Sequence, residues 1–182
     1  MKRFQWIQRG NHPPHYELQC NGTPYGSLSW VQGSRSTAVA EIAGGVMVFR
    51  REGILRRRIV IETLREELVA RISHLSLATS GELRHADGSH FRYTTKGGVE
   101  WSDAEGKVVA RIDQMAGEEG GSVLMEMTPA EGPFPLVLIF AGWYLYVTRR
   151  HDVETPPVTV EAGLSSLETG LSLTGSGSTS AH

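Results

Sequence analysis

The sequence has little that would cross-link it, recruit nucleic acid or direct it to secretion. Its single cysteine, Cys20, excludes an intrachain disulfide. The formal net charge is -2, from 18 Lys and Arg against 20 Asp and Glu, so no overall basic field attracts a nucleic acid. The first residues lack an apolar run of signal-peptide length. We therefore expect a cytoplasmic protein, either free or peripheral to the membrane.

Motifs of enzymes and cofactor sites are missing as well. There is no Walker A loop, no HExxH or CxxC motif and no Rossmann fingerprint. Cys20 follows an alternating segment and precedes a turn, which favours a buried, inert thiol over a nucleophile. We therefore expect no cofactor and no enzymatic activity. The alternative is an enzyme whose site is assembled from distant residues, for example His74, His85 and Glu100.

Short alternating or β-branched segments, separated by turn residues, fill the chain from residue 15 to residue 127. Asn21-Gly22 and Asp87-Gly88 are strong hairpin signals. The pattern predicts a mainly β protein, a closed antiparallel barrel of about twelve strands. Residues 61–73 also fit a helix by apolar spacing. We favour two strands joined at Thr63 to Glu67, because the sequence Val-Ala-Arg-Ile of this segment recurs further along the chain.

The stretch from Leu136 to Val147 carries no charge and is apolar on every side of a helix. It is too short for a bilayer span, which needs about 20 apolar residues. A helix that is apolar all round must be buried all round, and the inside of a barrel provides that place. Ala141 and Gly142 would allow the wall to approach closely. We predict a central hydrophobic helix near residues 135–150, preceded by a capping box at Thr128 to Glu131.

These assignments divide the chain into three parts. Residues 1–14 are interpreted as an N-terminal segment that leads into the barrel. Residues 15–152 form the barrel domain with its central helix. Residues 153–182 contain no Lys or Arg and are rich in Ser, Thr and Gly, which predicts a flexible tail without assigned function.

The main candidate site is a cluster of arginines around an expected hairpin turn. Such a cluster suits phosphate groups or an anionic membrane surface, at about 1 kcal/mol per basic residue near the surface. The alternative is a solvated turn whose charges pair with Glu62, Glu66 or Glu67. The cluster comprises Arg50, Arg51, Arg56, Arg57 and Arg58.

A second candidate has the chemistry of a metal site. His85, Asp87 and His90 lie within six residues, and all three side-chain types are metal ligands. They surround one hairpin turn and have no nearby cysteine or further histidine. We therefore interpret them as a solvated hairpin tip and expect no metal.

The chain resembles the tubby C-terminal-like superfamily, which includes tubby-like proteins, phospholipid scramblases and LURP-one-related proteins, and in particular its small bacterial members. The similar segments are the hairpin from Gly81 to Tyr93, the stretch from Glu100 to Gly106, and Leu136 to Tyr146 with Arg149 to Asp152 behind it. The resemblance covers roughly residues 15–152. It implies a barrel of about twelve strands threaded by the C-terminal helix. Tubby-like proteins as a family bind phosphoinositides, so the resemblance also implies phospholipid binding.

Together these features predict a non-enzymatic binding or scaffold domain. Its expected ligands are anionic phospholipids or phosphate groups, held by the arginine cluster. The alternative is a protein–protein interaction module with no small ligand, which would use barrel edges or the C-terminal tail. Neither nucleic acid partners nor a transmembrane span are expected.

Overall fold

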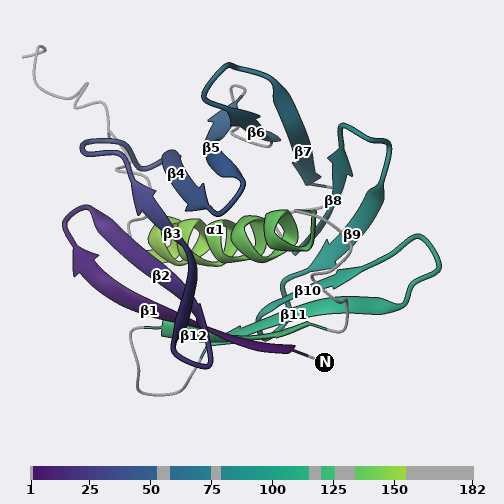
Figure 1. The fold of residues 1–182 in the computed structure, drawn as a ribbon. Coiled ribbons are helices and arrows are strands. Elements are labelled where there is room, and N and C mark those ends of the chain that lie inside the picture. Colours follow the sequence, from purple (N-terminus) through teal and green to yellow (C-terminus); the bar gives the residue numbers. More distant parts are fainter. Residues whose placement is uncertain (1, 53–57, 75–78, 115–119, 126–133, 155–182) are drawn as a thin grey trace, which may run out of the picture.

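The structure, a computed structural model, describes residues 2–52, 58–74, 79–114, 120–125 and 134–154. Twelve antiparallel strands form a closed barrel around a single described helix, α1 (Phe134–Glu154) (Figure 1). Each strand pairs with its neighbours in sequence, and β1 pairs with β12 to close the ring. The predicted fold class is confirmed. The strands are β1 (Lys2–Asn11), β2 (Pro14–Cys20), β3 (Thr23–Trp30), β4 (Thr37–Ile42), β5 (Gly45–Glu52), β6 (Arg58–Thr63), β7 (Leu68–His74), β8 (Ser80–His85), β9 (His90–Thr94), β10 (Val99–Ser102), β11 (Val108–Gln114) and β12 (Gly120–Met125).

Strand β1 corrects the interpretation of residues 1–14 as a segment outside the barrel. It pairs with both β2 and β12, and its Phe4 and Trp6 side chains are buried in the core. The alternation of these two aromatics with polar neighbours is a strand signal. This strand pattern is hard to recognise in the sequence, because a register shift between Gln8 and Gly10 interrupts it after two inward residues.

The two-strand interpretation of residues 61–73 is confirmed. Strands β6 and β7 pair antiparallel, with Ile61 opposite Ala70. In the turn between them, the Thr63 N–H donates to the Glu67 carbonyl at 2.9 Å, and the Glu66 N–H donates to the Thr63 carbonyl at 3.0 Å. Ile61 and Ile72 are fully buried, whereas Leu64 and Leu68 are exposed. The apolar residues at helical spacing therefore do not form one buried face, as they would on a helix.

Helix α1 is the core of the barrel, as predicted. Every side chain from Val137 to Thr148 is buried except Tyr146, which is half-buried. Figure 1 shows the strands wrapped around it. The helix extends to Glu154, about a turn beyond the predicted end. The predicted capping box and the tail from residue 155 onward lie outside the described residues.

Small residues let the helix and the barrel wall approach each other. In α1, a Cβ at Gly142 would lie 2.9 Å from Nε1 of Trp101 on the wall. On β12, a Cβ at Gly121 would lie 2.7 Å from Cη2 of Trp143 on the helix. Both distances are too short for real contacts, so each glycine makes room for an indole ring of the opposite element.

Aromatic contacts fix how the helix sits in the barrel. The Trp143 ring stacks on Trp6 and on Tyr146, with ring centroids 5.5 Å and 5.0 Å away. The Tyr144 hydroxyl donates a hydrogen bond of 2.7 Å to the carbonyl of Ser36, in the loop between β3 and β4. The C-terminal part of α1 is therefore tied to one end of the barrel.

Candidate functional site

The two ends of the barrel differ in charge. We call the end at which α1 terminates the basic end. The β3–β4 loop and the β9–β10 turn lie at this end, because Tyr144 and Arg149 of α1 contact Ser36 and Thr95. The end of β5 lies there too, because Thr37 pairs with Arg50. The described acidic side chains of the basic end are Glu52 and Asp113. Besides Arg9 and Arg50, which pair with Glu17 and Glu62, its exposed basic side chains are Arg35, Arg58, Lys96 and Arg150.

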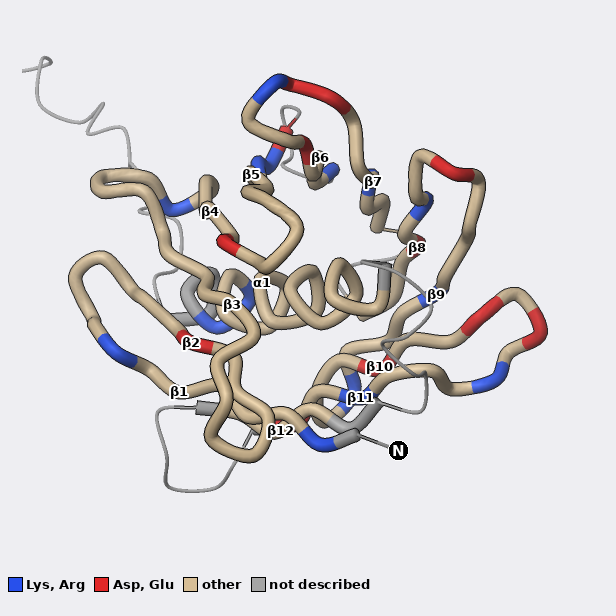
Figure 2. The backbone as a smooth tube through the Cα atoms, in the orientation of Figure 1, with Lys and Arg blue, Asp and Glu red and all other residues tan. Residues whose placement is uncertain are grey.

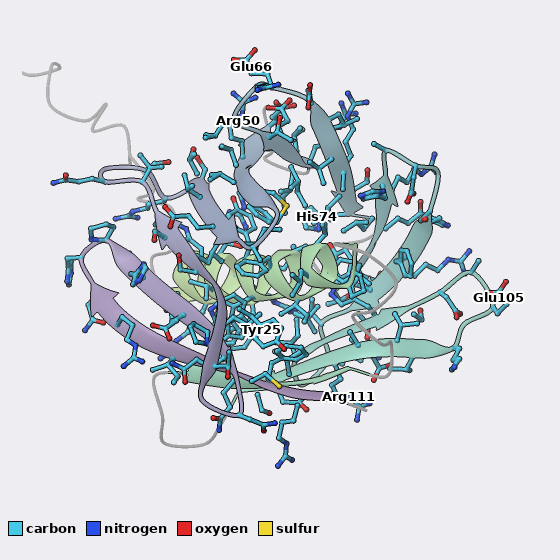
Figure 3. The ribbon with its side chains drawn as sticks, in the orientation of Figure 1. Tyr25, Arg50, Glu66, His74, Glu105 and Arg111 are labelled. Atoms are coloured by element: carbon cyan, nitrogen blue, oxygen red, sulfur yellow. The ribbon has the colours of Figure 1, made fainter. Side chains whose placement is uncertain are left out.

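We call the opposite end, where β6 joins β7, β8 joins β9 and β10 joins β11, the acidic end. Figure 2 shows acidic positions in each of these turns, and Figure 3 shows Glu66 and Glu105 projecting outward from two of them. Among the described side chains, charge is thus separated along the barrel axis, although the net charge of the chain is only -2. The turns carry Glu66, Glu67, Asp87, Asp103 and Glu105 against Arg65 and Lys107.

The described members of the predicted arginine cluster lie at the basic end, but strand alternation divides them. Arg50 is on the outer face of β5, where its guanidinium pairs with the Glu62 carboxylate. Arg51 is half-buried and continues the inward side of β5. Arg58 is exposed at the start of β6. Arg56 and Arg57 lie outside the described residues. The predicted pairing with Glu62 is present for Arg50, whereas Arg51 and Arg58 belong to different surfaces.

A polar pair interrupts the apolar inner wall at the basic end. The His74 imidazole, on β7, forms a hydrogen bond through Nδ1 with the Tyr93 hydroxyl on β9. Gly81 on β8 lies between them in the sheet, opposite His74 on one side and Tyr93 on the other. A Cβ at Gly81 would lie 2.6 Å from the Tyr93 hydroxyl oxygen. The glycine therefore leaves the space that the Tyr93 hydroxyl occupies.

The guanidinium groups of Arg51 and Arg149 affect the His74–Tyr93 pair electrostatically. Arg149, near the end of α1, donates to the Thr95 side chain and, at 3.3 Å, to the Thr95 carbonyl. Burial raises the pKa of the Tyr93 hydroxyl, while the charges of Arg149 and Arg51 partly oppose that rise. Burial and the Arg51 charge both lower the pKa of His74. We call Arg51, His74, Tyr93 and Arg149 the inner rim.

The lowered pKa of His74 predicts a loss of stability in acid. Below its usual pKa of about 6.5, the unfolded chain binds a proton that the folded protein accepts only at lower pH. The stabilisation is therefore complete above about pH 6.5 and is lost as the pH falls through the folded value. We expect His74→Asn, which keeps an acceptor for Tyr93, to flatten the pH dependence. Thermal denaturation between pH 5 and 8 measures this, and parallel curves for both proteins would contradict it.

The predicted hairpin at Asp87-Gly88 forms, and its histidines are separated. His85 is on the inward side of β8 and contacts Asp87 at 2.9 Å, whereas His90 is on the outward side of β9 and pairs with Glu82 at 3.1 Å. Hydrogen bonds from Ser89 lower the pKa of Asp87 to about 2, with His85 contributing less. Among the described residues no group of three His, Cys, Asp or Glu side chains could hold a metal ion.

The other candidate residues do not come together. His74 and His85 are at opposite ends of the paired strands β7 and β8, about 13 Å apart along the strand. Glu100 is on the outer face, where its carboxylate accepts a hydrogen bond of 3.0 Å from Nε of Arg111. The distant-residue enzyme site therefore does not form from these three. Cys20, at the end of β2, is half-buried, less buried than expected.

The inner rim was missed by sequence analysis, although part of its signal was present. Arg51 continues the inward series of Met47 and Phe49, and Tyr93 continues that of Phe91. Inward polar residues at strand ends could therefore have been found. Their meeting with Arg149 depends on strand register and on the direction of the helix, which a single sequence does not show.

Comparison with known proteins gives no relative. No family model, no curated protein and no solved structure matches the chain. Within the described part of the chain, no helix is both long and apolar enough to cross a bilayer. The function of the site is therefore inferred from its geometry and charge.

Proposed function

We propose that the protein is a non-enzymatic binding domain whose basic end faces the phosphate groups of anionic phospholipids. The supporting observation is the separation of charge between the barrel ends. The β3–β4 loop, the start of β6 and the β9–β10 turn present Arg35, Arg58 and Lys96 at the basic end. Within the described residues none of the three forms an ion pair. The resemblance to tubby-like proteins favours the same chemistry.

The distance between the ends makes this separation effective. A seven-residue strand such as β7 spans about 23 Å, and strand tilt reduces the axial distance to about 15–20 Å. The Debye length at physiological salt is about 8 Å, so the acidic end is screened from a surface that the basic end touches. Val31 in the β3–β4 loop is 42% exposed and adds an apolar side chain to the basic end.

The test is sedimentation with vesicles of neutral or anionic lipid at low and high salt. The variant carries Arg35→Glu, Arg58→Glu and Lys96→Glu. At about 1 kcal/mol per basic residue, we expect its affinity for anionic vesicles to fall at least about 100-fold. Binding of the unaltered protein should weaken steeply with salt.

The matched control variant changes the net charge by the same amount, but at the acidic end. It carries Arg3→Glu, Arg65→Glu and Lys107→Glu, all at exposed positions. We expect it to retain most of the binding. An equal loss in both variants would show that net charge, not the basic end, controls binding. No binding to vesicles under any condition would overturn the proposal.

The alternative, a protein-interaction module, was expected to bind its partner through barrel edges or the C-terminal tail. The described barrel is closed, so no edge strand is free to accept a strand from a partner. A partner protein would have to bind the loops or the outer wall. Binding that persists at high salt, and that ignores lipid charge, would favour this alternative.

A further inference from the structure

The inner rim brings polar and positively charged side chains together where the inner wall is otherwise apolar. Its four side chains come from β5, β7, β9 and α1, at the end where the apolar inner wall stops. Ile59, opposite Arg51, and Ile72, two residues before His74, are fully buried. The change from fully buried apolar residues to two arginines and a histidine places positive charge at the end of the inner wall, which favours an anion.

The described charges around His74 are all positive or neutral. Arg51 on β5 acts on it electrostatically, Gly81 on β8 carries no side chain, and Tyr93 on β9 shares its Nδ1. Arg149 on α1 acts on Tyr93. Because Nδ1 is engaged by Tyr93, Nε2 is the ring nitrogen available to a ligand. The histidine would therefore present a donor to an anion once protonated.

We infer that the inner rim binds a phosphate monoester, held by the guanidinium groups of Arg51 and Arg149 and by Nε2 of His74. Donors from β5, β7 and α1 suit a group with three terminal oxygens and a higher charge better than a carboxylate with two oxygens. A monoester also carries about -1.5 to -2 charges at pH 7, whereas a phosphodiester carries one. This inference rests on the proposed function and adds selectivity among anionic lipids.

Each residue of the inner rim has a separate role. Arg149 and Arg51 supply positive charge, which attracts the anion whatever other contacts these side chains make. His74 takes up a proton when the anion binds, since a nearby negative charge favours the imidazolium. Tyr93 is a positioning residue that is fully buried and orients the imidazole through Nδ1. Gly81 leaves room for the Tyr93 hydroxyl.

The experiment compares vesicles that contain phosphatidic acid, a monoester, with vesicles that contain phosphatidylglycerol, a diester, matched for surface charge. We expect the unaltered protein to prefer phosphatidic acid about tenfold or more. Arg149→Gln and His74→Asn should abolish that preference and leave general anionic binding intact. Arg58→Gln, an exposed control, should weaken binding to both lipids and keep the preference. Thermal denaturation checks that each variant is folded.

A second arm uses glycerol 3-phosphate, a soluble monoester, in calorimetric titrations at pH 7.5. Titration in two buffers of different ionisation enthalpy reports proton uptake, which should be present in the unaltered protein and absent in His74→Asn. Binding of this probe without vesicle binding would keep the inner-rim site, assign it to a soluble ligand and overturn the membrane proposal. Vesicle binding without monoester preference, or a preference that survives Arg149→Gln, would overturn the inner-rim site alone. No binding in either arm would overturn both.

Discussion

Phe140→Asp is expected to yield no folded protein. The Phe140 side chain is fully buried in the middle of α1, and its ring packs edge-on against Trp6 at a centroid distance of 5.0 Å. Loss of a buried phenylalanine costs about 3–5 kcal/mol, and an unpaired buried charge adds several more. That sum is comparable with the whole stability of about 5–15 kcal/mol of a typical domain. Circular dichroism and size-exclusion chromatography of the variant give the measurement.

A matched substitution separates this effect from the general cost of a new aspartate. Leu64→Asp makes a similar change in a turn at the acidic end, where Leu64 is 68% exposed. We expect it to alter the free energy of unfolding by no more than about 0.5 kcal/mol. A Phe140→Asp protein that remains folded and monomeric would show that α1 does not occupy the barrel.

Gly121→Val is expected to destabilise the barrel by about 3 kcal/mol, which lowers the melting temperature by about 6–12 °C. A Cβ at Gly121 would overlap the Trp143 ring. The ring has nowhere to move, because Trp6 and Tyr146 stack against it. The added side chain therefore forces strand β12 away from the helix.

A double-mutant cycle tests this cause. In a Trp143→Leu background the overlap is gone, so Gly121→Val should cost less, with a coupling energy of about 1–3 kcal/mol. Gly44→Val is the control, since a Cβ there has no neighbour within 4 Å, and its effect should stay near 0.5 kcal/mol. Additive costs in the cycle would mean that Gly121 is needed for its own backbone and not for the ring.

The sequence was informative where side-chain periodicity alone decides the structure. Alternation, with hairpin signals such as Asn21-Gly22, predicted the strands, and an uncharged stretch apolar on all sides predicted the buried helix. The two-strand choice over residues 61–73 was also right, because Ile61 and Ala70 both point inward from paired strands. The strands and the helix follow from local properties that each segment carries by itself, whereas the two-strand choice depended on the recurrence of Val-Ala-Arg-Ile.

Features that depend on pairing between distant segments were not predicted. The role of β1 follows from its pairing with β12, more than a hundred residues away. The division of Arg50 from Arg51 was also missed, although alternation within β5 alone accounts for it. The approach of Arg149 to Thr95 requires both the register of β9 and the direction of α1. Such juxtapositions come from tertiary structure, which local patterns do not encode.

The order of elements along the chain has a consequence for synthesis on the ribosome. All twelve strands precede α1, so their inner faces have no partner until the last described element has emerged. At about 5–20 residues per second, Trp6 waits roughly 7–28 s for Trp143, its stacking partner. During that interval the nascent chain exposes apolar strands, a state that favours aggregation. The protein should therefore depend on chaperones that shield nascent chains, and it should gain solubility when translation of the strands is followed quickly by translation of the helix.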